Sequence, residues 1–171
     1  MSADELWDLV DRDGVALGRT HRRGDGPVPT GTFHVIAATC AHRPDGRVLL
    51  TFRSARKDYP LSWEFPAGSA LAGETSVEAA ARELREETGL TPPVEEFGFV
   101  GRFVEESALV DVYAVALDDE PLLDLDPVEI ADSEWATPAQ VEARHRAGEF
   151  AAPWGPRLDQ LWTSIRSAIA S

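Results

Sequence analysis

The chain has 171 residues, which at roughly 150 residues per domain predicts one domain spanning residues 1–171. Its 16 Lys and Arg residues against 30 Asp and Glu residues give a formal net charge of −14, and a field of this sign repels nucleic-acid backbones and anionic membrane surfaces. Cys40 is the sole cysteine, which excludes an intramolecular disulfide and a multi-cysteine zinc site. The acidic N-terminus lacks a leader-like apolar run, so we expect a cytoplasmic protein.

Alternating apolar and polar segments bounded by turn residues predict β-strands. The strands predicted in this way lie at residues 6–10, 15–19, 33–41, 47–53, 63–65, 97–104, 109–117 and 130–136. The first two form an N-terminal hairpin over about residues 5–20, and the third and fourth form a second hairpin across Arg43-Pro-Asp-Gly46. Pro66 stops the short strand before it, and Gly68 and Gly73 predict irregular chain beyond that point.

Helix signals follow the fifth predicted strand. A capping box, Thr75-x-x-Glu78, opens a helix that Gly89 ends. Thr137 followed by Pro138 opens a second helix, and Pro156 opens a third, so that the C-terminal helices cover about residues 138–170. Strands, a helix, further strands and then helices predict an α/β or α+β sandwich with a mixed β-sheet between helices.

The central helix carries three carboxylates on one side. At roughly 100° per residue, Glu83, Glu86 and Glu87 fall within an arc of about 100°, beside an apolar stripe that would pack on the sheet. Oxygen-only ligands on one rigid element suit Mg²⁺, or Mn²⁺, and such ions bridge to substrate phosphates. A solvated glutamate-rich helix face is the other interpretation of this segment taken alone.

A longer pattern favours the metal site. Gly68, Glu74, Arg82-Glu83, Glu86-Glu87 and Gly89-Leu90 fit G-x5-E-x7-R-E-U-x-E-E-x-G-U, with U apolar, at every position. The chain therefore resembles the Nudix hydrolase family, whose box this is. The resemblance implies a Nudix α/β/α sandwich and Mg²⁺-dependent hydrolysis of a diphosphate linked to another moiety, usually in a nucleoside diphosphate derivative.

The resemblance also implies roles for individual residues. Glu83, Glu86 and Glu87 would be metal ligands together with the backbone carbonyl of Ala67, and Arg82 would pair with Glu74 to brace the loop against the helix. Glu86 is the first candidate for the general base that takes a proton from the attacking water. Glu129 resembles a loop glutamate that completes the metal site in some members, and a solvated loop end is the alternative.

The segment before the box supplies candidate substrate contacts. Arg53, Arg56 and Lys57 precede Glu64 and are predicted, with it, to bind the substrate; a solvated basic loop is the competing interpretation. The expected partner is a phosphorylated small molecule: a nucleoside diphosphate linked to another group, or a nucleoside triphosphate. The C-terminal helices fit a homodimer contact or a cover for the sheet equally well.

Two other functions stay open. The N-terminal block, with His34 at the head of a strand, resembles the subgroup related to isopentenyl diphosphate isomerase, but that enzyme needs a cysteine where this chain has Ala67 and a histidine where it has Ser69. The other alternative is a Nudix-like module that senses a nucleotide without hydrolysing it. Such modules typically lose box carboxylates, and this chain keeps them all.

Overall fold

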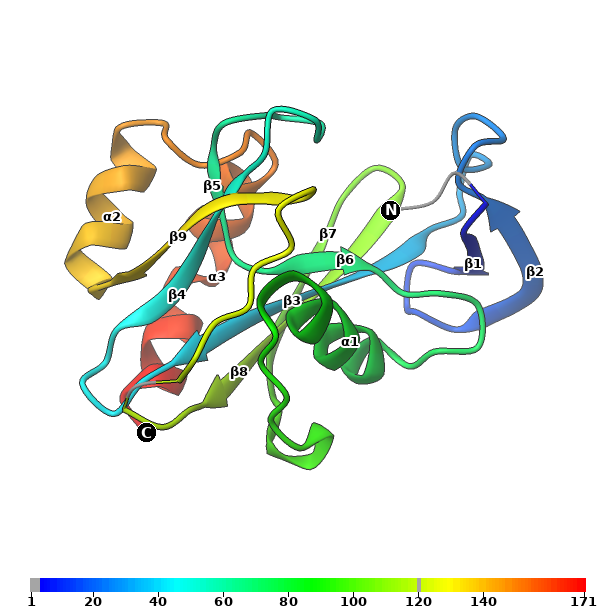
Figure 1. Cartoon of the computed structure of the whole chain (residues 1–171). Helices are drawn as coiled ribbons and strands as arrows, with labels where there is room; N and C mark the ends of the chain where they lie inside the picture. Colours follow the sequence, from blue (N-terminus) through cyan, green and yellow to red (C-terminus); the bar gives the residue numbers. More distant parts are fainter. Residues whose placement is uncertain (1–3, 120) are drawn as a thin grey trace.

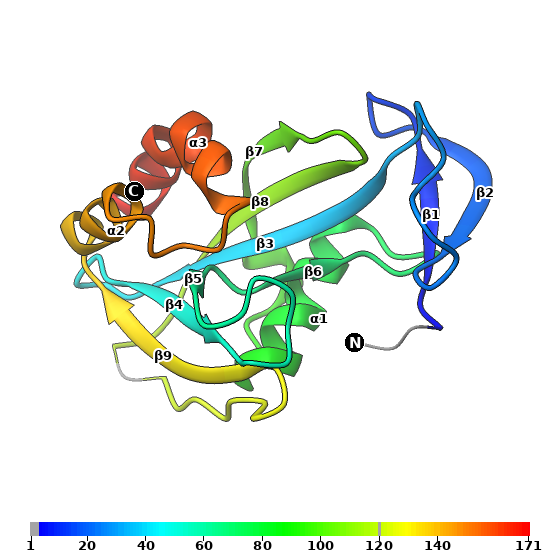
Figure 2. The same cartoon turned by 90° about the horizontal axis from the view of Figure 1, so that it is seen from above.

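The computed structural model describes residues 4–119 and 121–171. Helices lie on both sides of a mixed β-sheet, with α1 on one side and α2 and α3 on the other (Figures 1 and 2). A separate two-stranded hairpin stands at one end of the sheet, next to the N-terminus (Figure 1). The predicted α/β sandwich is therefore confirmed.

The strands follow the predicted order along the chain. The hairpin consists of β1 and β2, and β3 runs parallel to β8 while every other pairing is antiparallel. The main sheet has the order β5-β4-β3-β8-β7, with β6 on β3 and β9 on β4. The bounds are Leu6–Val10 (β1), Ala16–Arg22 (β2), His34–His42 (β3), Val48–Arg53 (β4), Trp63–Glu64 (β5), Ala67–Ser69 (β6), Gly98–Val104 (β7), Ala108–Ala116 (β8) and Ile130–Ala136 (β9).

The hairpin of β3 and β4 is joined at its turn end alone. Its register comprises a single pair, His42 with Val48. Beyond that pair the strands separate, and residues 63–69 fill the gap, with β5 bonded to β4 and β6 bonded to β3. The expectation of irregular chain around Gly68 was wrong, because this separation leaves an open edge of β3 that the segment around Gly68 pairs with.

The helices begin and end at residues that satisfy their free backbone groups. Thr75 caps α1 (Ser76–Thr88) with the predicted capping box, and Gly89 ends it in the left-handed conformation at φ 76°. Thr137 caps α2 (Pro138–Arg146) in the same way. A short 3₁₀ helix, Val94–Glu96, was not predicted. No helix in the described residues is long and apolar enough to cross a membrane.

The last helix, α3 (Trp154–Ile169), starts two residues before the predicted Pro156. Proline fits any of the first helical positions, whose amide groups have no partner within the helix, so the proline marked the first turn and not the first residue.

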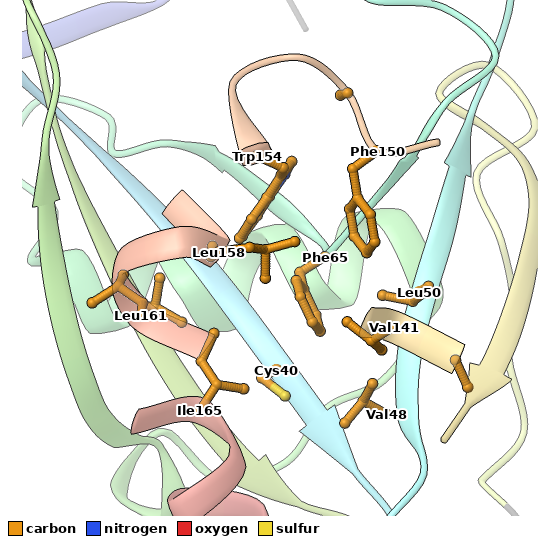
Figure 3. Close-up of a cluster of buried hydrophobic side chains, with 14 residues drawn as sticks. Cys40, Val48, Leu50, Phe65, Val141, Phe150, Trp154, Leu158, Leu161 and Ile165 are labelled. Carbon is orange, nitrogen blue, oxygen red and sulfur yellow. The ribbon is translucent and has the colours of Figure 1, made fainter. Parts of the chain in front are cut away.

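The sheet buries both of its faces. On the α1 face Leu49, Leu84 and Ala80 are enclosed, and on the other face Phe65, Trp154 and residues of α2 and α3 form a second cluster (Figure 3). Cys40 belongs to this second cluster, fully buried among apolar side chains, and burial raises the pKa of its thiol. The thiol therefore lies inside the core and away from the solvent.

Candidate active site

The box carboxylates differ sharply in exposure. The side chain of Glu86 is 52% exposed, whereas those of Glu83 and Glu87 are 14% and 2% exposed. Glu87 comes one turn after Glu83 and lies against the loop that leads into β9, since its carbonyl accepts a hydrogen bond from the amide of Asp126 at 3.0 Å. The helix thus presents one carboxylate to solvent and holds two in the interior.

Arg82 binds the loop that precedes α1. Its Nε and Nη2 donate to the two carboxylate oxygens of Glu74 at 2.7 and 3.0 Å, and Nη2 also donates to the carbonyl of Ser69 at 3.0 Å. Burial opposes ionisation of Glu74, yet the hydrogen bonds from Arg82 and from the Leu71 amide lower its pKa below the ordinary value. The structure therefore places Arg82 where the resemblance implied, as a brace between loop and helix.

The absence of a side chain at Gly68 leaves room for the carboxylate of Glu83. A Cβ atom at position 68 would lie 2.1 Å from Cδ of Glu83, so the carboxylate occupies the space that a side chain would take. Arg82 donates to Glu83 from Nη1 at 2.5 Å. Burial raises the pKa of Glu83, and the neighbouring Arg82 acts in the opposite direction. Residue 68 must be glycine if this carboxylate is to reach the strand.

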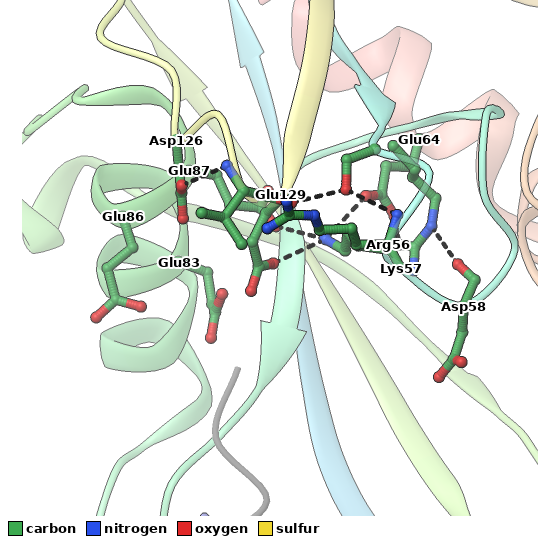
Figure 4. Close-up of polar contacts among 12 residues, drawn as sticks. Arg56, Lys57, Asp58, Glu64, Glu83, Glu86, Glu87, Asp126 and Glu129 are labelled. Atoms are coloured by element: carbon green, nitrogen blue, oxygen red, sulfur yellow. Dashed lines mark hydrogen bonds and ion pairs between the residues drawn. The ribbon is translucent and has the colours of Figure 1, made fainter.

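Lys57 is the centre of a buried ionic cluster (Figure 4). Its Nζ lies 3.0 Å from Glu129, 3.2 Å from Glu87 and 3.4 Å from Glu64, and its side chain is 5% exposed. Burial alone would lower the pKa of Lys57, but the three carboxylates hold it above the ordinary value. The ammonium group therefore balances the negative charge that β5, α1 and the loop before β9 bring together.

Glu64 and Arg53 extend this cluster. Arg53 donates from Nη1 to Glu64 Oε2 at 2.6 Å and from Nε to the carbonyl of Asp58 at 2.7 Å. Glu64 is 3% exposed, and its carboxylate accepts hydrogen bonds from two cations of the protein, Arg53 and Lys57. Arg56, by contrast, is exposed, and its backbone amide bonds Ser54 Oγ. The structure brings together Arg53, Lys57, Glu64, Glu87 and Glu129, and leaves Arg56 at the surface.

One oxygen of Glu87 lacks a partner. Oε2 is buried and has no hydrogen bond within the residues described, while Oε1 bonds Lys57. Burial raises the pKa of Glu87 well above the ordinary value, and Lys57 offsets part of this effect. An unsatisfied buried oxygen of this kind is rare in proteins and calls for an explanation such as an ion. The donor set of hard oxygens fits Mg²⁺ or Mn²⁺.

The box carboxylates do not converge on one point. Among residues 4–119 and 121–171, no group of three or more His, Cys, Asp or Glu side chains is arranged to hold a metal ion. Positive charge at the carboxylates comes instead from Arg82 and Lys57.

A cleft of about 170 Å³ opens beside this cluster. Ala67, Gly68 and Ser69 of β6 line it, together with Arg53, Lys57 and Glu64. Its other walls include residues from segments far along the chain whose contribution sequence analysis missed: Arg23, Pro153 and Arg157. No local spacing relates these residues to the box, so only the tertiary structure reveals them.

Comparisons with known proteins point to one family. The NUDIX domain family model matches residues 32–158. An uncharacterized Nudix hydrolase of Listeria innocua is 34% identical over 149 residues, covering 85% of this chain and 88% of the relative. The isopentenyl-diphosphate Delta-isomerase of Streptomyces coelicolor is 29% identical over 173 residues, covering 94% of this chain and 85% of the enzyme.

Solved structures show the same fold. The crystal structure of DR0079 from Deinococcus radiodurans superposes with a TM-score of 0.74 at 22% sequence identity, covering 92% of this chain and 99% of that one. A family model that matches most of the chain, together with a relative of this identity and coverage, establishes the family. The chain belongs to the Nudix hydrolase family.

Proposed function

We propose that the protein is a divalent-metal-dependent hydrolase that cleaves a diphosphate linkage in a nucleoside diphosphate joined to another moiety, or in a nucleoside triphosphate. The observation that carries this proposal is the unpartnered buried oxygen of Glu87 beside a complete set of box carboxylates. Nudix-like modules that bind without reaction typically lose box carboxylates, and this chain keeps all three.

Glu83, Glu86, Glu87 and the carbonyl of Ala67 are the residues that would hold Mg²⁺ or Mn²⁺. When bound, such an ion neutralises the diphosphate and lowers the pKa of a water molecule that attacks phosphorus. Gly68 gives Glu83 the space to sit against β6, and Arg82 joins the helix to Ser69 of β6 and to Glu74 in the loop before the helix.

Glu86 suits the role of general base because it is the most exposed of the three carboxylates and can reach a water in the open site. Glu129 contributes negative charge at the inner end through Lys57. Arg53 lies at the cleft, where its guanidinium group suits a phosphate oxygen. Arg56 is close to it in sequence and exposed, and its role in binding the substrate stays a prediction.

The test is product release from a panel of nucleoside triphosphates, ADP-ribose, NADH, dinucleoside polyphosphates and nucleotide sugars, with Mg²⁺ and Mn²⁺ separately. The variant Glu86→Gln should lower kcat by about 10² to 10⁴-fold. Glu95→Gln is the matched control, since it makes the same change at an exposed glutamate outside the cleft. Wild-type rates in Glu86→Gln would reject Glu86 as the base.

An isomerase activity is the second candidate, because the similarity to the Streptomyces coelicolor isomerase spans 94% of the chain. The chain has Ala67 where that reaction needs a thiol, and Cys40 is fully buried among apolar side chains of the core. Isomerisation of isopentenyl diphosphate is assayed in parallel. If no compound is hydrolysed and a nucleotide still raises Tm, a sensing function replaces the hydrolase.

A further inference from the structure

Besides Arg53 and Lys57, the cleft has another cationic residue outside the Nudix box. Arg157, near the start of α3, lines the cleft together with Arg53, Lys57 and Gly68. Its side chain is 8% exposed. In a chain with a net charge of −14, a nearly buried arginine at the substrate cleft is a specific feature and not part of a general basic surface.

Two neighbours hold the guanidinium group of Arg157 in one orientation. Nε and Nη2 each lie 2.7 Å from the same oxygen, Oε1 of Glu105. On another side, the central carbon of the guanidinium group lies 5.2 Å from the ring centre of Trp154, which is 1% exposed and anchored in the core (Figure 3). A group held in this way loses little conformational entropy when it binds a ligand.

The remaining amino group is available. Nη1 of Arg157 makes no hydrogen bond or ion pair within the described part of the chain, and it is not among the buried atoms there that lack a partner. It is therefore accessible to solvent, in a residue that lines the cleft. An arginine stays charged at every relevant pH, and its N–H groups favour phosphate and carboxylate oxygens.

We propose that Arg157 binds a second anionic group of the substrate, a phosphate or carboxylate on the moiety attached to the scissile diphosphate. The proposal rests on the proposed function, with the diphosphate bound at the side of the cleft that Gly68 lines. Arg157 is then a specificity-determining residue, and Glu105 and Trp154 are positioning residues that act through it.

The experiment compares ligands that differ by one anionic group: NADPH with NADH, and UDP-glucuronate with UDP-glucose. Dissociation constants are measured by calorimetry with Ca²⁺ present, so that binding is read independently of turnover, and kcat/KM is added for each compound that is hydrolysed. Wild-type protein should prefer the more anionic member of at least one pair by about tenfold. Arg157→Gln should reduce that ratio to near 1.

Two further variants separate recognition from stability. Glu105→Gln keeps Arg157 and removes its counter-charge, so the ratio should rise above the wild-type value. Arg166→Gln, on the same helix but paired with Glu142 at the surface, is the matched control and should leave the ratio unchanged. A role of Arg157 confined to tying α3 to the sheet would lower Tm in Arg157→Gln without altering the ratio.

The proposal is overturned if wild-type protein shows no preference, if no member of either pair binds, or if Arg157→Gln keeps the preference at wild-type size in folded protein. Failure of the proposed function gives a different result. The ligands would then bind with the Arg157-dependent ratio, but the protein would hydrolyse no compound of the panel.

Discussion

The carboxylate of Glu83 rests against the backbone of Gly68, in the space where a Cβ atom would come within 2.1 Å of it. The atom in the way is the end of a flexible side chain, so an added methyl group would displace the carboxylate and not the strand. This contact separates the requirements of the site from those of the fold.

Gly68→Ala should therefore reduce activity far more than stability. We expect kcat/KM with Mg²⁺ to fall by at least about tenfold, since a misplaced ligand weakens the metal site, while the free energy of unfolding changes by less than about 1 kcal/mol. Gly98→Ala is the control, because its Cβ would lie at an ordinary 3.8 Å from the carbonyl oxygen of Ala114. A loss of stability in Gly68→Ala as large as its loss of activity would contradict this interpretation.

Lys57→Met should destabilise the metal-free protein. Removing the ammonium group leaves Glu87 buried without its positive partner, and breaking a buried ion pair from one side costs about 3–5 kcal/mol. Mg²⁺ should then raise Tm by more in Lys57→Met than in the wild type, since the ion takes over the missing charge. Thermal unfolding with and without Mg²⁺ measures both effects.

The double variant Lys57→Met, Glu87→Gln is the internal control for that prediction. Neutralising both partners removes the uncompensated charge, so part of the lost stability should return and the added effect of Mg²⁺ should disappear. If the double variant is less stable than Lys57→Met by the full cost of Glu87→Gln alone, the two groups are not coupled.

His34 should make stability depend on pH. Burial is the main reason why its pKa is lowered to about 4 in the folded protein from an ordinary 6.5. Between pH 6.5 and 4, His34 is therefore protonated in the unfolded chain and neutral in the folded protein. His34 therefore reduces stability as pH falls through this window, by up to about 3 kcal/mol, and has no such effect above pH 6.5.

Urea unfolding of wild-type protein and His34→Gln between pH 4 and 7 tests this expectation. The buried Glu83 and Glu87, whose pKa values are raised, contribute the opposite slope in both proteins, so the difference between the two curves isolates His34. Parallel curves would show that His34 takes up its proton equally in both states.

Thr75→Ala should cost about 1 kcal/mol of unfolding free energy, because the hydroxyl group satisfies the amide of Glu78 at the start of α1. Thr75→Ser keeps the hydroxyl and should retain most of the stability. Equal loss in both variants would indicate that the methyl group of Thr75, and not its hydrogen bond, stabilises the helix.

Local signals predicted the parts of the structure that depend on neighbours in the chain. The capping box at Thr75, the left-handed Gly89 and the strand Ile130–Ala136 all lie where the sequence placed them. The β6 strand was missed because its pairing with β3 requires β4 to diverge after His42 and Val48, and no local pattern reports that.

The same distinction applies to the site. The resemblance to the Nudix box implied the pairing of Arg82 with Glu74, and the structure has this contact. The burial of Lys57 among Glu64, Glu87 and Glu129 joins four separate segments, and a lysine in a loop looks solvated in the sequence alone. Arg157 was not singled out at all for the same reason.

The separation of β3 from β4 also sets an order for folding. Residues 63–69 can pair with both strands only after the turn at His42 and Val48 has brought the strands together. We therefore expect the strand pairs of this segment to form late in folding. Substitutions there would then speed unfolding more than they slow refolding. Because Glu64, Ala67, Gly68 and Ser69 of this segment line the cleft, the proposed substrate site and the unfolding rate of the sheet depend on one stretch of seven residues.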